Sequence, residues 1–204
     1  MKDAVLDSLE AAYSDCSSGK LSVKDYLKFI EETLSKCEDM EEVDTLMFYA
    51  LRDDRTEGLS TCERLAEKSL LLRKSRKLKP KTIQGREATP TYELLCIAER
   101  FAQFEKPQSS SMFLKYFDLA TASASSTLDY EILVTSLAVA CRNIDDQTLD
   151  PGYEKCRELI DKAFKLAVED KSTSSLDSLA YTAENDIGDK KLAKRIKDAR
   201  KKLK

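Results

Sequence analysis

Histidine and tryptophan are both absent from this sequence of 204 residues. The missing histidine removes the most common general base and the most common transition-metal ligand in proteins. Five glycines and four prolines are few for a sheet protein, which needs many turns, and no glycine-rich phosphate loop is present. We therefore expect no enzymatic activity, no catalytic residues, no cofactor and no metal ion. Without tryptophan, the core must depend mainly on leucine, alanine, isoleucine and valine.

Apolar runs long enough for a transmembrane helix are also missing, and residues 1–20 contain acidic side chains where a signal peptide would be apolar. The six cysteines lie 15 to 45 residues apart and include no C-x-x-C pair. This spacing argues against a zinc site and favours small buried thiols. We expect an intracellular, cytoplasmic protein, and the basic runs described below leave a nuclear location open.

Apolar residues recur at helical spacing through most of the chain. The clearest example is the segment 176–203, where a Gly188-Asp189 break separates two apolar stripes. The stripe residues are Leu176, Leu179, Ala180 and Ala183, then Leu192, Ala193, Ile196 and Ala199. Because stripes of this period account for nearly every apolar cluster, we predict an all-α fold of about ten helices with no sheet.

Two amphipathic helices joined by a turn cannot bury both of their apolar stripes alone, so consecutive hairpins must stack on one another. The predicted hairpins cover residues 2–37, 40–73, 90–122, 127–169 and 174–203. Together they make one helical-repeat domain over residues 1–204, an α-solenoid of stacked antiparallel hairpins. An irregular helical bundle is the alternative, because the interval between equivalent positions varies.

Several helix starts are predicted from local sequence. A serine followed three residues later by an acidic residue is typical of a helix N-terminus. Such pairs are Ser22 with Asp25, Ser60 with Glu63, Ser126 with Asp129, and Ser174 with Asp177. Thr89 before Pro90 also predicts a start, since proline is favoured at the first helical position.

Small and large packing residues in two of the hairpins follow a known spacing. In the last hairpin they are Leu179, Ala180, Ala183, Leu192, Ile196 and Ala199, and in the third they are Ile97, Ala98, Phe101, Leu114 and Phe117. This spacing resembles the tetratricopeptide repeat, over about half the chain. The resemblance implies a concave surface, built by the first helix of each pair, that binds peptides or proteins.

Residues on these first helices are the candidates for such a surface. They are Tyr92, Glu99, Asp177, Tyr181 and Glu184. We expect the chain to be a non-enzymatic protein–protein interaction module whose partner is another protein or peptide. An adaptor, a chaperone-like binder and a toxin-neutralising partner all fit this expectation.

Positive charge is concentrated in two segments, although the net charge is −3. Residues 69–86 contain seven basic residues and no acidic one, and residues 189–204 contain nine basic residues and two acidic ones. Apolar periodicity disappears over residues 74–89, which predicts a basic loop that is either disordered or functional. Its candidate binding residues are Arg73, Lys74, Arg76, Lys77, Lys79, Lys81 and Arg86.

These cations suggest a second function, an RNA- or phosphate-binding protein that uses the basic loop and the basic C-terminal helix. No aromatic residue lies between the cations, so base stacking is not supported and nucleic acid is the less favoured partner. A solvated loop that rests against the acidic remainder of the chain explains the same composition.

Overall fold

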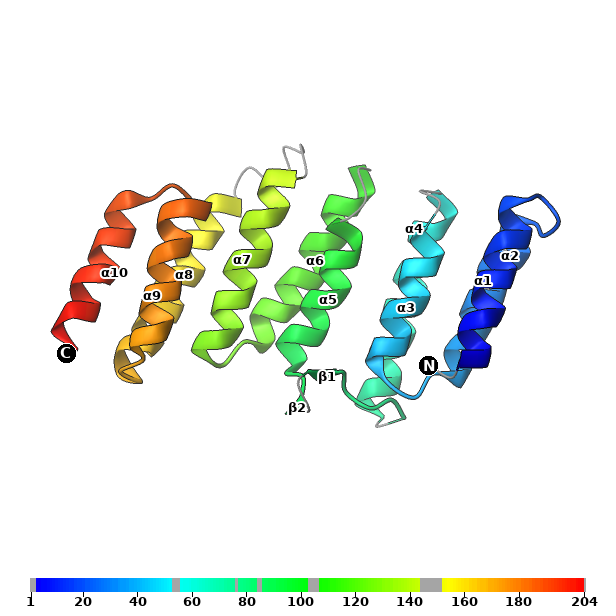
Figure 1. Ribbon diagram of the computed structural model, residues 1–204, viewed down its shortest axis with the longest axis horizontal. Helices are drawn as coiled ribbons and strands as arrows, with labels where there is room; N and C mark the ends of the chain where they lie inside the picture. The colour runs from blue at the N-terminus through cyan, green and yellow to red at the C-terminus, as the bar shows by residue number, and fades with distance from the viewer. Residues whose placement is uncertain are drawn as a thin grey trace. The chain divides into compact units, whose positions relative to one another are not determined.

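The computed structural model divides into two compact units, Met1–Ala88 and Thr89–Lys204. We describe each unit by itself, and the single domain over residues 1–204 stays a prediction. Figure 1 labels the helices and strands of both units. The structure describes residues 3–52, 56–75, 77–83, 86–102, 107–143 and 152–203.

The N-terminal unit contains two helical hairpins followed by a short β-hairpin. Its elements are α1 (Asp3–Ser17), α2 (Val23–Thr33), the 3-10 turn η1 (Leu34–Lys36), α3 (Met40–Leu51), α4 (Thr56–Lys74), β1 (Thr82–Ile83) and β2 (Arg86–Glu87). Helix α2 contacts α1, α3 and α4, so the two hairpins pack on each other within this unit. Strands β1 and β2 are antiparallel.

The C-terminal unit contains three helical hairpins. Its elements are α5 (Pro90–Ala102), α6 (Pro107–Ser123), α7 (Thr127–Asn143), α8 (Gly152–Glu169), α9 (Thr173–Tyr181), the π-helical turn η3 (Thr182–Asp186) and α10 (Lys190–Lys202). Helix α7 contacts α5 on one side and α9 on the other, while α8 contacts α9 and α10. Helices α5, α7 and α9 therefore form one layer, with α6 and α8 behind it (Figure 1).

The all-α prediction is confirmed, with ten α-helices in the described part of the chain. The helix pairs α1–α2, α3–α4, α5–α6, α7–α8 and α9–α10 occupy the five predicted hairpin ranges. The β1–β2 pair is the exception to the predicted absence of a sheet. Each strand has two residues, too few for the alternation that identifies a strand in sequence. No helix of the described residues is long and apolar enough to cross a bilayer.

The core of the C-terminal unit consists mainly of leucine, alanine, isoleucine and valine, as predicted, and it also contains aromatic side chains. Phe101 of α5 stacks on Tyr116 of α6, with ring centroids 5.5 Å apart and an interplanar angle of 5°. Phe113 and Phe117 stack one turn apart on α6 at 5.4 Å. All four side chains are fully buried. Aromatic pairs in these geometries add to the stabilisation from area burial, so they anchor the α5–α6 hairpin.

Three of the predicted helix starts are confirmed by their hydrogen bonds. The Thr89 hydroxyl accepts from the Tyr92 amide at 3.2 Å, and α5 begins at Pro90. The Ser22 hydroxyl accepts from the Asp25 amide at 3.1 Å, and the Ser126 hydroxyl accepts from the Asp129 amide at 3.1 Å. The predicted start at Ser174 is wrong by two residues, because the Ser172 hydroxyl caps α9 instead. Three serines stand close together there, and the local pattern does not select among them.

The predicted helix start at Ser60 is wrong, because α4 already begins at Thr56. Gly58 lies inside the first turns of α4 and not before it. A Cβ atom at Gly58 would lie 2.2 Å from the backbone oxygen of Ala50, so only glycine allows α4 to approach α3 this closely. Gly58 therefore serves the packing of α4 on α3.

The segment predicted as a patternless loop, residues 74–89, is held against the N-terminal unit at several described points. Leu78 is buried, with 3% of its surface exposed. The Lys79 amide donates to the Glu38 carbonyl at 2.9 Å, and the Lys79 carbonyl accepts from the Met40 amide at 3.2 Å. Leu78 supplies one apolar anchor, too little to produce a periodic pattern.

Candidate functional site

The principal concave site of the C-terminal unit is a groove between α5 and α7, with a volume of about 510 Å³. Its walls are the facing sides of the first helices of two consecutive hairpins. The lining residues are Tyr92, Leu95, Cys96, Glu99 and Ala102 from α5, and Ile132, Thr135, Ser136, Val139 and Ala140 from α7. Most of the lining is apolar. Two of the predicted groove residues, Tyr92 and Glu99, therefore lie together in it.

Helical periodicity explains which side chains reach the groove. The α5 residues are spaced three and four apart along one face, as are those of α7. Leu95 is buried and forms part of the floor, whereas Val139 is 39% exposed and Glu99 is exposed at the rim. Among the described residues no ion-pair partner reaches Glu99. The groove thus combines accessible apolar surface with an available negative charge.

Ser136 places an unsatisfied polar group in the wall of the groove. The residue is 7% exposed, and its hydroxyl oxygen has no hydrogen-bond partner in the described part of the structure. Buried hydroxyl groups in proteins are normally hydrogen-bonded, because an unpaired one costs free energy. The hydroxyl oxygen is itself buried, so this polar atom lies behind the accessible lining of the groove.

Asp129 fixes the helix ends at one end of the groove. Its Oδ1 accepts from the Thr89 hydroxyl at 2.9 Å, and Thr89 in turn accepts from the Tyr92 amide at the start of α5. Its Oδ2 accepts from the amides of Ser125 and Ser126 at 3.1 Å and from the Ser126 hydroxyl at 2.9 Å. One carboxylate thereby ties the N-terminus of α5 to the N-terminus of α7.

Hydrogen bonding also sets the charge of Asp129. Burial alone would raise the pKa of this carboxyl, which is 3% exposed. The hydrogen bonds from Ser125, Ser126 and Thr89 stabilise the charged form and hold the pKa below its ordinary value. Sequence reasoning identified Asp129 as a local cap and missed its contact with Thr89, which is 40 residues away.

Comparison with protein-family models, curated proteins and solved structures gives no match. The functional proposal therefore rests on the residues themselves.

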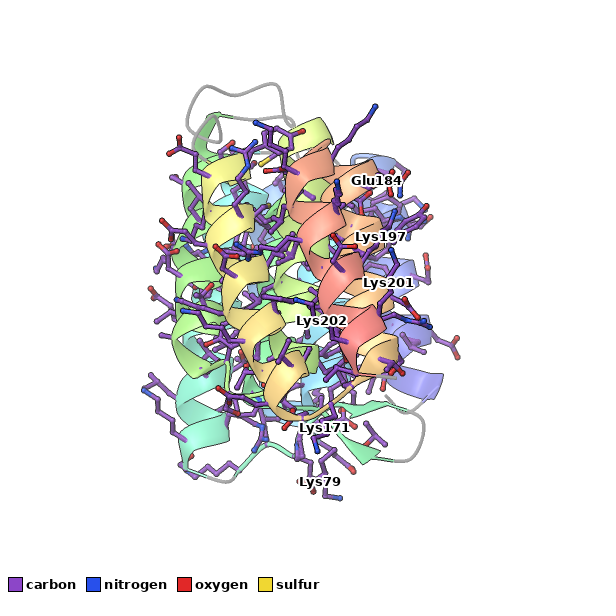
Figure 2. The ribbon with its side chains drawn as sticks, turned by 90° about the vertical axis from the view of Figure 1, so that its left-hand side faces the viewer. Lys79, Lys171, Glu184, Lys197, Lys201 and Lys202 are labelled. Carbon is purple, nitrogen blue, oxygen red and sulfur yellow. The ribbon has the colours of Figure 1, made fainter. Side chains whose placement is uncertain are left out.

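The other predicted groove residues lie on α9 and η3 and do not line the α5–α7 groove. Asp177 accepts from Arg200 at 2.8 Å, and Glu184 pairs with Lys197. Figure 2 shows Glu184 and Lys197 on the last hairpin. These carboxylates hold α10 against α9 and η3. Tyr181 remains exposed, at 65%.

In the described part of the basic segment, one cation is taken up by an ion pair and others are exposed. Lys81 Nζ lies 3.5 Å from Asp44 Oδ2 of α3, and both side chains are largely buried. Lys74, Lys77 and Lys79 are exposed, and Arg73 is half-buried. Arg76 and the side chain of Arg86 lie outside the described residues. Lys81, which was predicted to bind anions, therefore holds the segment against α3.

Basic side chains of α10 divide into two groups. Arg195, Lys197 and Arg200 pair with Asp161, Glu184 and Asp177, so these cations attach α10 to α8, η3 and α9. Five lysines remain exposed: Lys190, Lys191, Lys194, Lys201 and Lys202. Of these, Lys201 pairs with Asp198 on the same helix. Figure 2 labels Lys201 and Lys202. The cations of the C-terminal helix are thus partly structural and partly available.

Metal-binding and thiol chemistry find little support in the described structure. In the ranges that the structure describes, no group of three or more cysteine, aspartate or glutamate side chains is placed to hold a metal ion. All six cysteines are free thiols. Burial raises the pKa of Cys156 to about 12, and burial followed by the charges of Glu42 and Asp39 raises the pKa of Cys37 to about 12. These two thiols are therefore neutral and weakly nucleophilic near pH 7.

Proposed function

We propose that this chain is a non-enzymatic binding module that takes a segment of another protein into the α5–α7 groove. The observation that carries the proposal is the accessible apolar lining of this groove. The partner is an amphipathic segment with a row of apolar side chains and a basic residue that pairs with Glu99. Adaptor, chaperone-like and toxin-neutralising roles are all forms of this function.

The dimensions and chemistry of the groove support a protein segment as the occupant. A volume of about 510 Å³ accommodates several apolar side chains, and a groove between parallel rows of helical residues matches the apolar face of a helix. The proposal includes a tetratricopeptide-like arrangement, in which the first helix of each hairpin builds the binding surface. The layer of α5, α7 and α9 supports it, since these are the first helices of three consecutive hairpins. The six free thiols support a cytoplasmic location.

The test compares two aspartate substitutions at exposed apolar residues. Val139→Asp puts a charge in the groove, and Leu119→Asp puts one on α6, where Leu119 is 46% exposed outside the groove. A partner is first identified by cross-linking from the native source, and its contacting segment is then titrated as a synthetic peptide. We expect Val139→Asp to weaken peptide binding at least about tenfold, and Leu119→Asp to leave it unchanged. Equal affinities for both variants would contradict the proposal.

The alternative function, binding of RNA or another phosphate-rich partner, is supported by the five exposed lysines of α10. Binding of this kind weakens steeply with salt, because each neutralised phosphate releases counterions. Replacement of Lys190, Lys191, Lys194, Lys201 and Lys202 by serine should then abolish binding to a single-stranded RNA oligomer. Unchanged peptide binding by the same variant would separate this function from that of the groove.

A further inference from the structure

An arginine of the N-terminal unit lies inside a cage of aromatic rings. The Cζ atom of Arg52 is 4.1 Å from the ring centroid of Tyr13, 5.5 Å from that of Tyr49 and 6.0 Å from that of Phe48. These distances place the guanidinium within cation–π range of three rings. The rings come from α1 and from the last turn of α3, the helix that ends beside Arg52.

A carboxylate completes the cage. Arg52 Nη1 donates to both oxygens of Glu10, at 3.2 and 3.1 Å. The Tyr49 hydroxyl also donates to Glu10 Oε1. The carboxylate is therefore oriented by Tyr49 as well as by Arg52. Aromatic faces around a cation with a carboxylate at one side provide the electrostatic environment that proteins use to bind cationic ligands.

The walls of the cage have supports that do not involve Arg52. The ring of Tyr13 contacts that of Tyr26 on α2, with centroids 6.2 Å apart. The Tyr26 hydroxyl donates to the Tyr49 carbonyl at 3.0 Å, and Tyr49 is itself buried. The rings of Phe48 and Tyr49 meet edge to face at 5.8 Å. The site is thus built from three helices and does not depend on its present occupant for its shape.

Arg52 is held much less firmly than the walls. Its side chain is 33% exposed, and it contacts the cage rings and Glu10, whose side chain is 56% exposed. Exposed ion pairs and exposed cation–π contacts are each weak, so a competing cation can replace Arg52 at a modest cost. Phe48 is 44% exposed, which leaves the cage accessible from solvent.

We propose that the cage of Tyr13, Phe48, Tyr49 and Glu10 is a binding site for an arginine side chain of a partner protein, in which Arg52 acts as a displaceable internal ligand. Arginine is the favoured ligand, because the site already accepts a planar guanidinium whose donors face the carboxylate. This site is separate from the α5–α7 groove, and its test does not depend on the groove.

The experiment empties the cage and offers it a free guanidinium. The variant Arg52→Gln removes the internal ligand, and N-acetylarginine amide is the probe, followed through tyrosine ring signals in nuclear magnetic resonance spectra. Since an internal ligand reduces the fraction of open sites, Arg52→Gln should bind the probe about tenfold more tightly than the wild-type chain. Adding Tyr13→Leu to this variant removes one wall and should abolish binding.

Arg200→Gln is the matched control. Arg200 donates to Asp177 from Nε and Nη2 at 3.1 and 2.8 Å, so its removal leaves a carboxylate without an aromatic cage. This variant should not bind the probe. Binding equal to that of Arg52→Gln would show that any vacated carboxylate suffices and would overturn the proposal.

Two further outcomes also decide the matter. If tetramethylammonium binds to Arg52→Gln and N-acetylarginine amide does not, the site is selective for methylated ammonium and the arginine assignment is wrong. If Arg52→Gln remains folded by circular dichroism and binds neither cation, Arg52 is only a clamp between α1 and α3. Should this variant not fold, the wild-type chain is titrated with the probe while the Arg52 side-chain signal is followed, and an unchanged signal overturns the proposal.

Discussion

Replacing Asp129 tests how strongly one buried carboxylate joins the two helices that form the groove. The side chain accepts four hydrogen bonds, from the Thr89 hydroxyl, the amides of Ser125 and Ser126, and the Ser126 hydroxyl. A hydrogen bond to a charged group contributes about 1.5–3 kcal/mol. In Asp129→Ala these donors lose the carboxylate, and those that reach solvent recover part of the lost free energy by donating to water. We expect Asp129→Ala to lower the free energy of unfolding by about 3 kcal/mol.

Asp25 provides the matched control, because it occupies the same position in the cap of α2. Its carboxylate is exposed and accepts from the Ser22 hydroxyl at 2.6 Å. Asp25→Ala should therefore cost no more than about 1 kcal/mol. Urea unfolding followed by circular dichroism measures both variants. Equal losses of stability would refute the reasoning, since they would show that the contact with Thr89 adds nothing to a local cap.

The depressed pKa of Asp129 predicts a pH dependence with a definite sign. A carboxyl whose pKa is lower in the folded state stabilises the fold above its unfolded pKa, which is about 3.9, and this stabilisation is lost as the pH falls through the folded value. The difference in unfolding free energy between the wild type and Asp129→Asn should therefore be full at neutral pH and shrink below about pH 4. A constant difference between pH 7 and pH 3 would contradict this account.

Two predictions concern the N-terminal unit. Gly58→Ala should destabilise the protein by about 2 kcal/mol or more, because the added Cβ atom meets backbone atoms that cannot rotate away. Thermal unfolding measures this loss of stability. An unchanged melting temperature would show that α4 can shift away from α3. Asp44→Asn should speed tryptic cleavage after Lys77, because it weakens the ion pair between Asp44 and Lys81 that docks the basic segment. An unchanged cleavage rate would mean that the buried Leu78 holds the segment alone.

Local sequence determined the secondary structure of this chain. Apolar periodicity of 3.6 residues and the breaks between stripes located the five hairpins, because both signals depend on neighbours within about one or two helical turns. The caps at Ser22 and Ser126 were predictable for the same reason, since each bond closes within three residues. The errors were local as well: the start of α4 was predicted at Ser60 and lies at Thr56, and the cap of α9 was predicted at Ser174 and is Ser172.

The composition of the candidate site was only partly predictable. Tyr92 and Glu99 share the groove because helical spacing puts them on one face of α5. Nothing in the spacing of Asp177 and Glu184 indicated that they would form ion pairs with Arg200 and Lys197. A carboxylate on the exposed side of a helix has the same sequence signature whether it binds a partner or a neighbouring helix.

Tertiary structure alone decided which distant residues meet. Thr89 reaches Asp129 across 40 residues, Lys81 reaches Asp44 across 37, and Arg52 enters a cage that depends on Glu10, 42 residues away. Each contact requires two segments to pack with one particular axial offset and one particular rotation relative to each other. The packing of buried side chains sets both. The sequence shows which residues share one face of a helix, because they recur at helical spacing. Which faces pack against each other is decided only in the folded chain.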